Sequence, residues 1–257
     1  MSNIKTVMMG KVEVGCGAPK VIVPIVAKNR AGIVAKGQEL TQYTMDVVEW
    51  RVDFYDDVFD IPQVVETGRQ LRAALKDTPI LFTFRTKKEG GEKEITMDAY
   101  TALNKAMAES GYVDAIDVEI FSGDDIVRKN IANIHAADIP VVGSNHDFFK
   151  TPAKADLLSR LCKMQDMGAD IPKIAVMPQS KSDVIVLLDA TSEMAEKYAT
   201  RPLITMSMSK LGVISRLVGE AFGSSMTFGA VGQVSAPGQI PVEKLQTAMA
   251  IVHEAQK

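Results

Sequence analysis

A lysine lies within a short apolar segment that the sequence predicts to be a buried parallel strand. The segment reads I-P-K-I-A-V-M-P-Q-S over residues 171–180, and Lys173 is in phase with Ala175 and Met177. Burying an ammonium group is costly unless the group is paired or loses its proton, and a deprotonated amine is a nucleophile. The alternative is that Lys173 lies at the start of the strand and extends its amine to solvent.

Ionisable side chains also alternate with apolar ones in four other predicted strands. Each of these strands has one wholly apolar face that must pack on helices, so its charged face points toward the interior of the fold. Stability does not explain this arrangement, because aliphatic side chains would fill the interior at lower cost. The convergence indicates an active site, and the alternative is a self-compensating network of ion pairs. Besides Lys173, the set comprises Glu49, Arg51, Arg85, Asp117, Glu119 and His146.

The elements that must position these side chains alternate regularly between strand and helix. The predicted strands are 21–27, 47–52, 80–85, 115–120, 141–145, 172–178, 203–208 and 226–230. The predicted helices are 31–43, 62–75, 97–110, 124–137, 152–167, 182–198, 211–222 and 242–255. Eight such units in about 250 residues predict an α/β fold, a (β/α)8 TIM barrel, forming a single domain over residues 1–257. An open doubly wound sheet is the structural alternative, although no G-x-G-x-x-G motif or P-loop is present.

The first 19 residues are expected to form a short N-terminal β-hairpin. Its strands would be 7–9 and 11–14, with the turn at Gly10. The segment contains no apolar run typical of a signal peptide, and no run elsewhere approaches the ~18 apolar residues needed to span a bilayer.

Composition excludes several classes of function. A net charge of −3 gives no sign of nucleic-acid binding. The two cysteines, Cys16 and Cys162, form neither a CxxC pair nor a disulfide framework, as expected for a cytoplasmic protein. The histidines are too far apart in sequence to have metal-ligand spacing, so no metal site is expected.

Seven motifs, in order from about residue 20 to the end, closely resemble the signature of the type I 3-dehydroquinate dehydratases. They are E-W-R-V-D (49–53), F-T-F-R-T-K-K-E-G-G (82–91), D-V-E-I (117–120), V-V-G-S-N-H-D (141–147), I-P-K-I-A-V-M-P-Q-S (171–180), M-S-M-S-K-L-G-V-I-S-R (206–216) and S-A-P-G-Q-I (235–240). One departure is Pro24, which stands where many relatives carry serine, so no substrate contact by a hydroxyl is expected there.

The resemblance implies a specific reaction. Lys173 would form a Schiff base with the C3 ketone of 3-dehydroquinate, and the protonated imine would make the C2 proton acidic. His146 would remove that proton and then help the C1 hydroxyl to leave as water. Hydrolysis of the imine would release 3-dehydroshikimate, and neither a metal nor an organic cofactor is implied. The protein would act in the shikimate pathway, as a homodimer.

Further roles are implied by position in the motifs. Arg216 matches the residue that clamps the substrate carboxylate, and Glu89 matches the carboxylate that hydrogen-bonds the catalytic histidine and fixes its tautomer. Without the resemblance, Arg216 would be a surface charge on a helix and Glu89 a solvated loop residue. Residues at positions that bind substrate hydroxyls are Glu49, Arg51 and Arg85. Residues in a loop that resembles a lid over the substrate are Ser235 and Gln239.

Two other functions compete with a dehydratase. A Schiff-base aldolase or transaldolase would need phosphate-binding backbone near the last two strands, where this chain has Arg216 and S-A-P-G-Q. A non-catalytic domain that binds carboxylates would bind its ligand without any covalent adduct.

Overall fold

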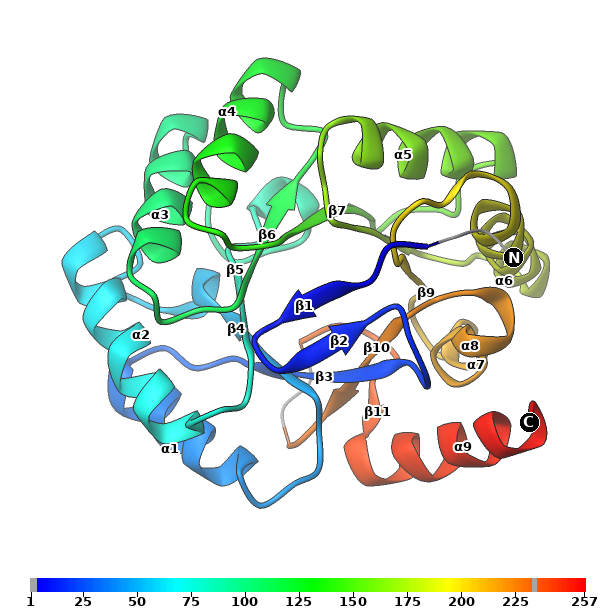
Figure 1. Cartoon of the computed structure of the whole chain (residues 1–257), viewed down its shortest axis with the longest axis horizontal. Helices are drawn as coiled ribbons and strands as arrows, with labels where there is room; N and C mark the ends of the chain where they lie inside the picture. The colour runs from blue at the N-terminus through cyan, green and yellow to red at the C-terminus, as the bar shows by residue number, and fades with distance from the viewer. Residues whose placement is uncertain (1–3, 233–234) are drawn as a thin grey trace.

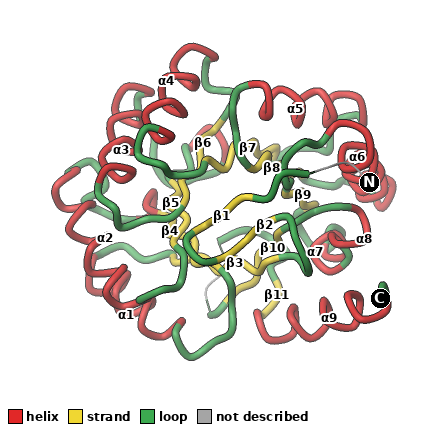
Figure 2. The backbone as a smooth tube through the Cα atoms, in the orientation of Figure 1, coloured by secondary structure: helices red, strands yellow, loops and turns green. Residues whose placement is uncertain are grey.

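The computed structural model describes residues 4–232 and 235–257, so residues 1–3 of the predicted hairpin segment lie outside it. Within the described residues, a curled parallel sheet is surrounded by helices (Figures 1 and 2). The sheet has the order β11-β10-β3-β4-β5-β6-β7-β8-β9. β9 and β10 meet at a parallel bridge between Leu203 and Ser224, so strands β3 to β10 enclose a barrel. The predicted (β/α)8 fold is confirmed, and the closure consists of this bridge, not of a longer ladder.

The strand bounds agree closely with the predicted ones. The sheet strands are β3 Lys20–Ile25, β4 Val47–Arg51, β5 Ile80–Thr83, β6 Ala115–Glu119, β7 Val141–Asp147, β8 Ile171–Val176, β9 Ile204–Ser207, β10 Met226–Ala230 and β11 Ile240–Pro241. β11 was not predicted, because a pair of residues carries no periodic signal.

The helices cover the outside of the barrel. They are α1 Arg30–Leu40, α2 Ile61–Leu75, α3 Met97–Glu109, α4 Asp124–His135, α5 Lys154–Asp166, α6 Lys181–Glu193, α7 Val213–Leu217, α8 Gly219–Phe222 and α9 Val242–Ala255. Side chains cap several N-termini, and at α6 the Ser180 hydroxyl and the Asp183 carboxylate form a reciprocal capping box. No helix in the described ranges combines the length and apolar character needed to cross a membrane.

The predicted helix over residues 211–222 is wrong, because two short helices occupy this segment. The chain leaves helical geometry at Val218, where φ is −106° and ψ is 13°. Gly219 then packs so closely on Ser224 that a Cβ would lie 3.2 Å from the Ser224 Cβ. The break at Val218 changes the direction of the chain before β10 begins. The hydrophobic spacing alone does not reveal this break.

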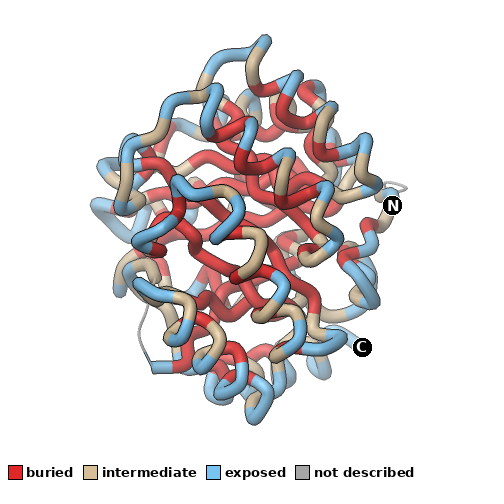
Figure 3. Tube along the Cα trace, turned by 90° about the vertical axis from the view of Figure 1, so that its left-hand side faces the viewer, coloured by how far each residue is buried: buried red, intermediate tan, exposed pale blue. Residues whose placement is uncertain are grey.

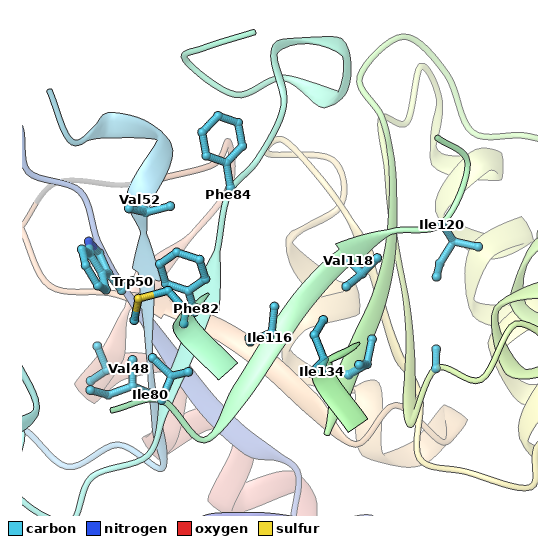
Figure 4. Close-up of a cluster of buried hydrophobic side chains, with 14 of the residues drawn as sticks. Val48, Trp50, Val52, Ile80, Phe82, Phe84, Ile116, Val118, Ile120 and Ile134 are labelled. Carbon is cyan, nitrogen blue, oxygen red and sulfur yellow. The ribbon is translucent and has the colours of Figure 1, made fainter. Parts of the chain in front are cut away.

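Strand alternation divides the buried side chains into two layers. The outer layer lies between sheet and helices and includes Val48, Trp50 and Phe82 of the strands. Ile134 of α4 belongs to the same layer and lies near Ile116 and Val118 of β6 (Figure 4). The inner layer fills the barrel and includes Val47, with the remaining strand members Ile22, Leu81, Ala115, Val142, Ile171, Ala175, Ile204, Met206, Met226 and Phe228. Figure 3 shows buried chain through the middle of the molecule and exposed chain on its periphery. Each strand therefore presents the face that its alternation predicted.

The N-terminal hairpin closes one end of the barrel, as Figure 1 shows. Its strands are β1 Val7–Met9 and β2 Val12–Val14, and its turn contains Gly10 with φ of +52°. Val7, Met9 and Val14 join the inner hydrophobic layer. The Gly10 turn lies against Asp114, which immediately precedes β6, so the hairpin covers the amino-terminal ends of the strands. The opposite end of the barrel is left for the loops.

Replacing Met9 with alanine tests this closure. Met9 is fully buried and Met8, beside it on β1, is 53% exposed. We expect Met9→Ala to lower the free energy of unfolding in urea by ~2–5 kcal/mol, because it removes buried methylenes and leaves a cavity. Met8→Ala is the matched control, with an expected change within ~0.5 kcal/mol. Equal effects of the two substitutions would show that the hairpin does not close the inner core.

Candidate active site

A pocket with about 480 Å³ of empty volume opens at the carboxyl-terminal end of the barrel strands. This is the end at which (β/α)8 enzymes carry their active sites. Its charged and polar lining comes from strands, a helix and connecting segments that are far apart in sequence: Glu49, Arg51, Arg85, His146, Lys173, Arg216, Ser235 and Gln239. Of the predicted site residues, Asp117, Glu119 and Glu89 do not line this pocket, and all the others do. Glu89 lies behind it, in contact with His146.

Lys173 lies on β8 with only 3% of its surface exposed. Its Nζ donates a hydrogen bond to Asp117 Oδ2 at 3.1 Å and lies 3.8 Å from Glu49 Oε1. The Phe228 ring packs against the amine, with its centroid 4.9 Å from Nζ. Lys173 is thus buried and paired, and it does not extend to bulk solvent. The carboxylates of Asp117 and Glu49 are its charged partners. Lys173 also lines the pocket.

Asp117 and Glu119 form the charged floor below the pocket. Arg85 donates to Asp117 Oδ1 at 2.8 Å and to Glu119 Oε1 at 2.9 Å. Burial raises the pKa of the Asp117 carboxyl, but Arg85 and Lys173 outweigh burial and hold that pKa below its ordinary value. Neither of these two carboxylates lines the pocket. Their geometry therefore fits the alternative given above, a self-compensating network of ion pairs. Their negative charges compensate the positive charges of Lys173 and Arg85.

His146 is oriented by Glu89. The Glu89 Oε2 atom accepts the backbone N–H of His146 at 2.9 Å and lies 3.1 Å from the ring Nδ1. An oxygen that already accepts one N–H from this residue is suited to accept the Nδ1 proton too, which leaves Nε2 unprotonated. Phe148 stacks on the imidazole, with centroids 6.4 Å apart. Glu89 is 6% exposed and is not the solvated loop residue that its local sequence suggests.

Burial moves the pKa values of this pair in opposite directions. It raises the pKa of the Glu89 carboxyl to about 7, and Glu119 adds to the rise while Arg85 opposes it. Burial lowers the pKa of His146 well below its ordinary 6.5, and the cations Arg85 and Lys173 lower it further. The imidazole is therefore neutral at neutral pH, which is the state required of a base.

Arg51 is held by a carboxylate that the sequence analysis did not single out. Asp53 is fully buried and accepts two hydrogen bonds from the Arg51 guanidinium, each 2.8 Å long. The signal was present, because Asp53 is in phase with Glu49 and Arg51 in E-W-R-V-D. Asp53 lies beyond the end of β4, in a short 3-10 helix, so strand alternation alone could not place it.

Arg216 is a buried cation on α7 whose environment differs from that of Arg51. Its guanidinium donates to the Pro237 carbonyl at 3.2 Å and approaches the Met206 sulfur at 3.6 Å. Within the described residues its Nε has no hydrogen-bond partner, and the guanidinium forms no ion pair. Burial lowers the pKa of Arg216 to about 10. A buried, incompletely satisfied guanidinium that lines a pocket is a group suited to bind an anion.

Ser235, Ala236 and Gln239, which follow β10 in the chain, line the pocket together with Arg216. Ser235 N–H donates to Gln239 Oε1 at 2.9 Å, and Gln239 Nε2 donates to Ser235 Oγ at 3.0 Å. These two bonds tie the segment into a compact turn.

Pro24, the departure from the family pattern, pairs in register with Glu49 on the neighbouring strand.

Apolar side chains also line the pocket, and the pattern of charges in the sequence does not indicate them. They are Phe148, Phe228, Ala175, Met206 and Met208, with Ala236 and Gly90 at the rim. Glycine is needed at position 90, because a Cβ there would lie 2.3 Å from the Phe148 ring. In the parts of the chain that the structure describes, no group of three or more His, Cys, Asp or Glu side chains could hold a metal ion. The pocket offers a buried lysine, an imidazole whose pKa is lowered, and a guanidinium that has no counter-ion among the described residues.

Comparison with known proteins identifies the family. The family model described as type I 3-dehydroquinase matches residues 21–256. The 3-dehydroquinate dehydratase of Escherichia coli O1:K1 is 52% identical over 252 residues, which cover 98% of this chain and all of that protein. A crystal structure of type I 3-dehydroquinate dehydratase from Clostridium difficile, with covalent modified comenic acid, has a TM-score of 0.95 at 50% identity, covering 98% and 99% of the two chains. The Geobacillus kaustophilus 3-dehydroquinate dehydratase also has a TM-score of 0.95, at 35% identity and 98% coverage of both chains. Family model, sequence relatives and solved structures all agree, and this chain belongs to the type I 3-dehydroquinase family.

Proposed function

We propose that this protein is a 3-dehydroquinate dehydratase that works through a Schiff base on Lys173. The observation that carries the proposal is that Lys173, with 3% of its surface exposed, lines the same pocket as His146. A buried lysine beside a base suits attack on a ketone followed by removal of a neighbouring proton. Membership of the family supports the same reaction.

The reaction balances with the residues at hand. The amine adds to the C3 ketone of 3-dehydroquinate and one water leaves, giving a protonated imine. His146 takes the C2 proton through Nε2, and the electron pair flows into the imine. The C1–O bond then breaks, and the proton on His146 leaves with the hydroxyl as water. Addition of a water to the conjugated imine releases 3-dehydroshikimate and restores Lys173.

Arg216 would bind the substrate carboxylate. A carboxylate at its guanidinium would satisfy the buried Nε and balance the charge, whereas a neutral ligand would leave both uncompensated. Glu49, Arg51 and Arg85 would bind the ring hydroxyls, and Ser235 with Gln239 would close over the substrate. A sugar-phosphate aldolase is a poorer fit, since the segment after β10 presents S-A-P-G-Q to the pocket.

We extend the proposal to the cellular role. The reaction supplies the shikimate pathway of aromatic amino acid biosynthesis, and the expected location is the cytoplasm. A homodimer is expected from the resemblance to the family.

The nucleophile can be identified by chemical trapping. Borohydride added with 3-dehydroquinate should reduce the imine and leave a covalent adduct that peptide mass spectrometry maps to Lys173. Lys173→Ala should form no adduct and lose turnover, with a circular-dichroism spectrum like that of the wild type. Lys181→Ala, at an exposed position that begins α6, is the control and should keep both. An adduct on another lysine, or near-native turnover by Lys173→Ala, would exclude this mechanism.

Replacement of His146 separates imine formation from proton removal. His146→Ala should still form the borohydride-trapped adduct, while turnover falls by about 10²–10⁴-fold because the base is missing. His135→Ala is the matched control, since His135 lies on α4 and pairs with Asp170. Turnover in His146→Ala at the wild-type rate would assign the base to another group.

The raised pKa of Glu89 predicts the pH dependence. As pH falls through about 7, Glu89 gains a proton and no longer stabilises positive charge on the His146 ring, so kcat/KM should decline below that pH. The depressed pKa of His146 alone would place the decline at much lower pH. Measurement of kcat/KM across about pH 5 to 8.5 distinguishes the two cases. A plateau that persists well below pH 6.5 would refute the assignment to Glu89.

A further inference from the structure

A chain of hydrogen bonds leads outward from His146 to the surface of α5. Asn145 lies on β7 next to His146, but its side chain belongs to the outer face of the sheet, and it is 9% exposed. Its Nδ2 donates to Glu89 Oε1 at 3.0 Å, and its Oδ1 accepts from Arg160 Nη1 at 3.0 Å. Asn145 therefore connects the Glu89 loop, which follows β5, with a helix that follows β7.

The direction of the Asn145 amide is set by its partners. A guanidinium only donates hydrogen bonds, so the amide oxygen must face Arg160 and the amide N–H₂ must face Glu89. Arg160 is itself fixed by Asp156, which accepts from Nε at 3.1 Å and from Nη2 at 2.8 Å. The Phe121 ring packs against the guanidinium at 6.0 Å. This support makes Asn145 a donor toward Glu89 in a single orientation.

Both oxygens of Glu89 consequently receive N–H groups, Oε1 from Asn145 and Oε2 from His146. The other charged groups that face Glu89 oppose each other. Arg85 Nη1 lies 3.8 Å from Oε2 and favours the carboxylate, whereas Glu119 on β6 favours the protonated acid. With burial and Glu119 both favouring protonation, the bond from Asn145 helps to keep the carboxylate ionised at neutral pH.

We propose that Asn145, oriented by Arg160, is a positioning residue that keeps Glu89 an acceptor for Nδ1 of His146 and so presents Nε2 as the base. Asn145 does not line the pocket and acts only through Glu89. The role of the base rests on the proposed dehydratase function, but the tautomer of His146 in the free protein does not.

Substitutions at position 145 distinguish a donor from a spacer. Asn145→Asp keeps the shape and the acceptor for Arg160 but places a carboxylate against Glu89, while Asn145→Ala only removes the donor. Both should lower kcat at pH 7, by about tenfold for Asn145→Ala and more for Asn145→Asp, with KM changed less than twofold. The acid limb of kcat/KM should move up by about one pH unit, because Glu89 then holds its proton more tightly.

Arg160→Ala should have a smaller effect in the same direction, since the amide loses the group that fixes its orientation. The matched control is Arg128→Ala, which removes an arginine from the exposed face of the neighbouring helix α4. It should leave kcat, KM and the acid limb unchanged. Thermal unfolding of each variant verifies that the chain is folded at the assay temperature.

The tautomer of His146 gives a readout that does not depend on turnover. The chain has three histidines, so ¹⁵N-histidine labelling gives few ring signals, and His146→Ala assigns the one of interest. The wild type should show protonated Nδ1 and unprotonated Nε2 at neutral pH. Asn145→Asp should shift the population toward the Nε2–H tautomer, because a protonated Glu89 can donate to Nδ1.

The outcomes are separable. A loss of kcat with an unmoved acid limb and an unchanged His146 tautomer would reduce Asn145 to a packing role and overturn the inference. Wild-type kinetics in Asn145→Asp would do the same. A wild-type protein that does not convert 3-dehydroquinate would refute the proposed function, while the tautomer measurement would still decide the inference about Asn145.

Discussion

The ion pair between Lys173 and Asp117 is the interaction on which the rest of the site depends. The two groups are 3% and 0% exposed and lie 3.1 Å apart, so neither charge can be solvated by bulk water. Removing one partner of a buried pair typically costs ~3–5 kcal/mol, because the remaining charge is uncompensated. Asp117 can serve the lysine only because Arg85 and Ser144 occupy its other oxygen. The hydrogen bonds to Asp117 therefore hold Lys173 in place, and its amine remains available to a ligand in the pocket.

Two buried arginines in the same pocket differ in whether their guanidinium group has a carboxylate partner. Both carboxylate oxygens of Asp53 accept hydrogen bonds from Nε and Nη2 of Arg51, and this pairing fixes the direction of its guanidinium. Arg216 is equally removed from solvent, yet a carbonyl and a sulfur are its partners among the described residues. A buried cation without a counter-ion is unfavourable in the free protein, and a bound anion relieves that penalty. The ligand is thus expected to complete the electrostatics of the pocket.

The two ends of the barrel have different tasks. At the amino-terminal end, the hairpin contributes Val7, Met9 and Val14 to the inner core and seals it. At the carboxyl-terminal end, the segment after β5 brings Glu89, and α7 brings Arg216, to residues on the strands. The Glu89 loop can approach β7 because glycine at position 90 leaves room for Phe148. Residues that stabilise the barrel and residues of the candidate active site therefore lie at opposite ends of the same strands.

Sequence alone determined the repeating strand–helix order and the charged face of five of the strands, because both depend on local periodicity. It also determined that Lys173 and His146 lie on inward-facing positions of strands. Tertiary structure alone decided that Glu89 is buried, that Arg216 has no counter-ion within residues 4–232 and 235–257, and that Asn145 connects Glu89 with Arg160. Each of these facts depends on a loop or helix meeting a strand from another unit. Such contacts arise only when barrel closure sets the distances between units, and no spacing within one segment encodes them.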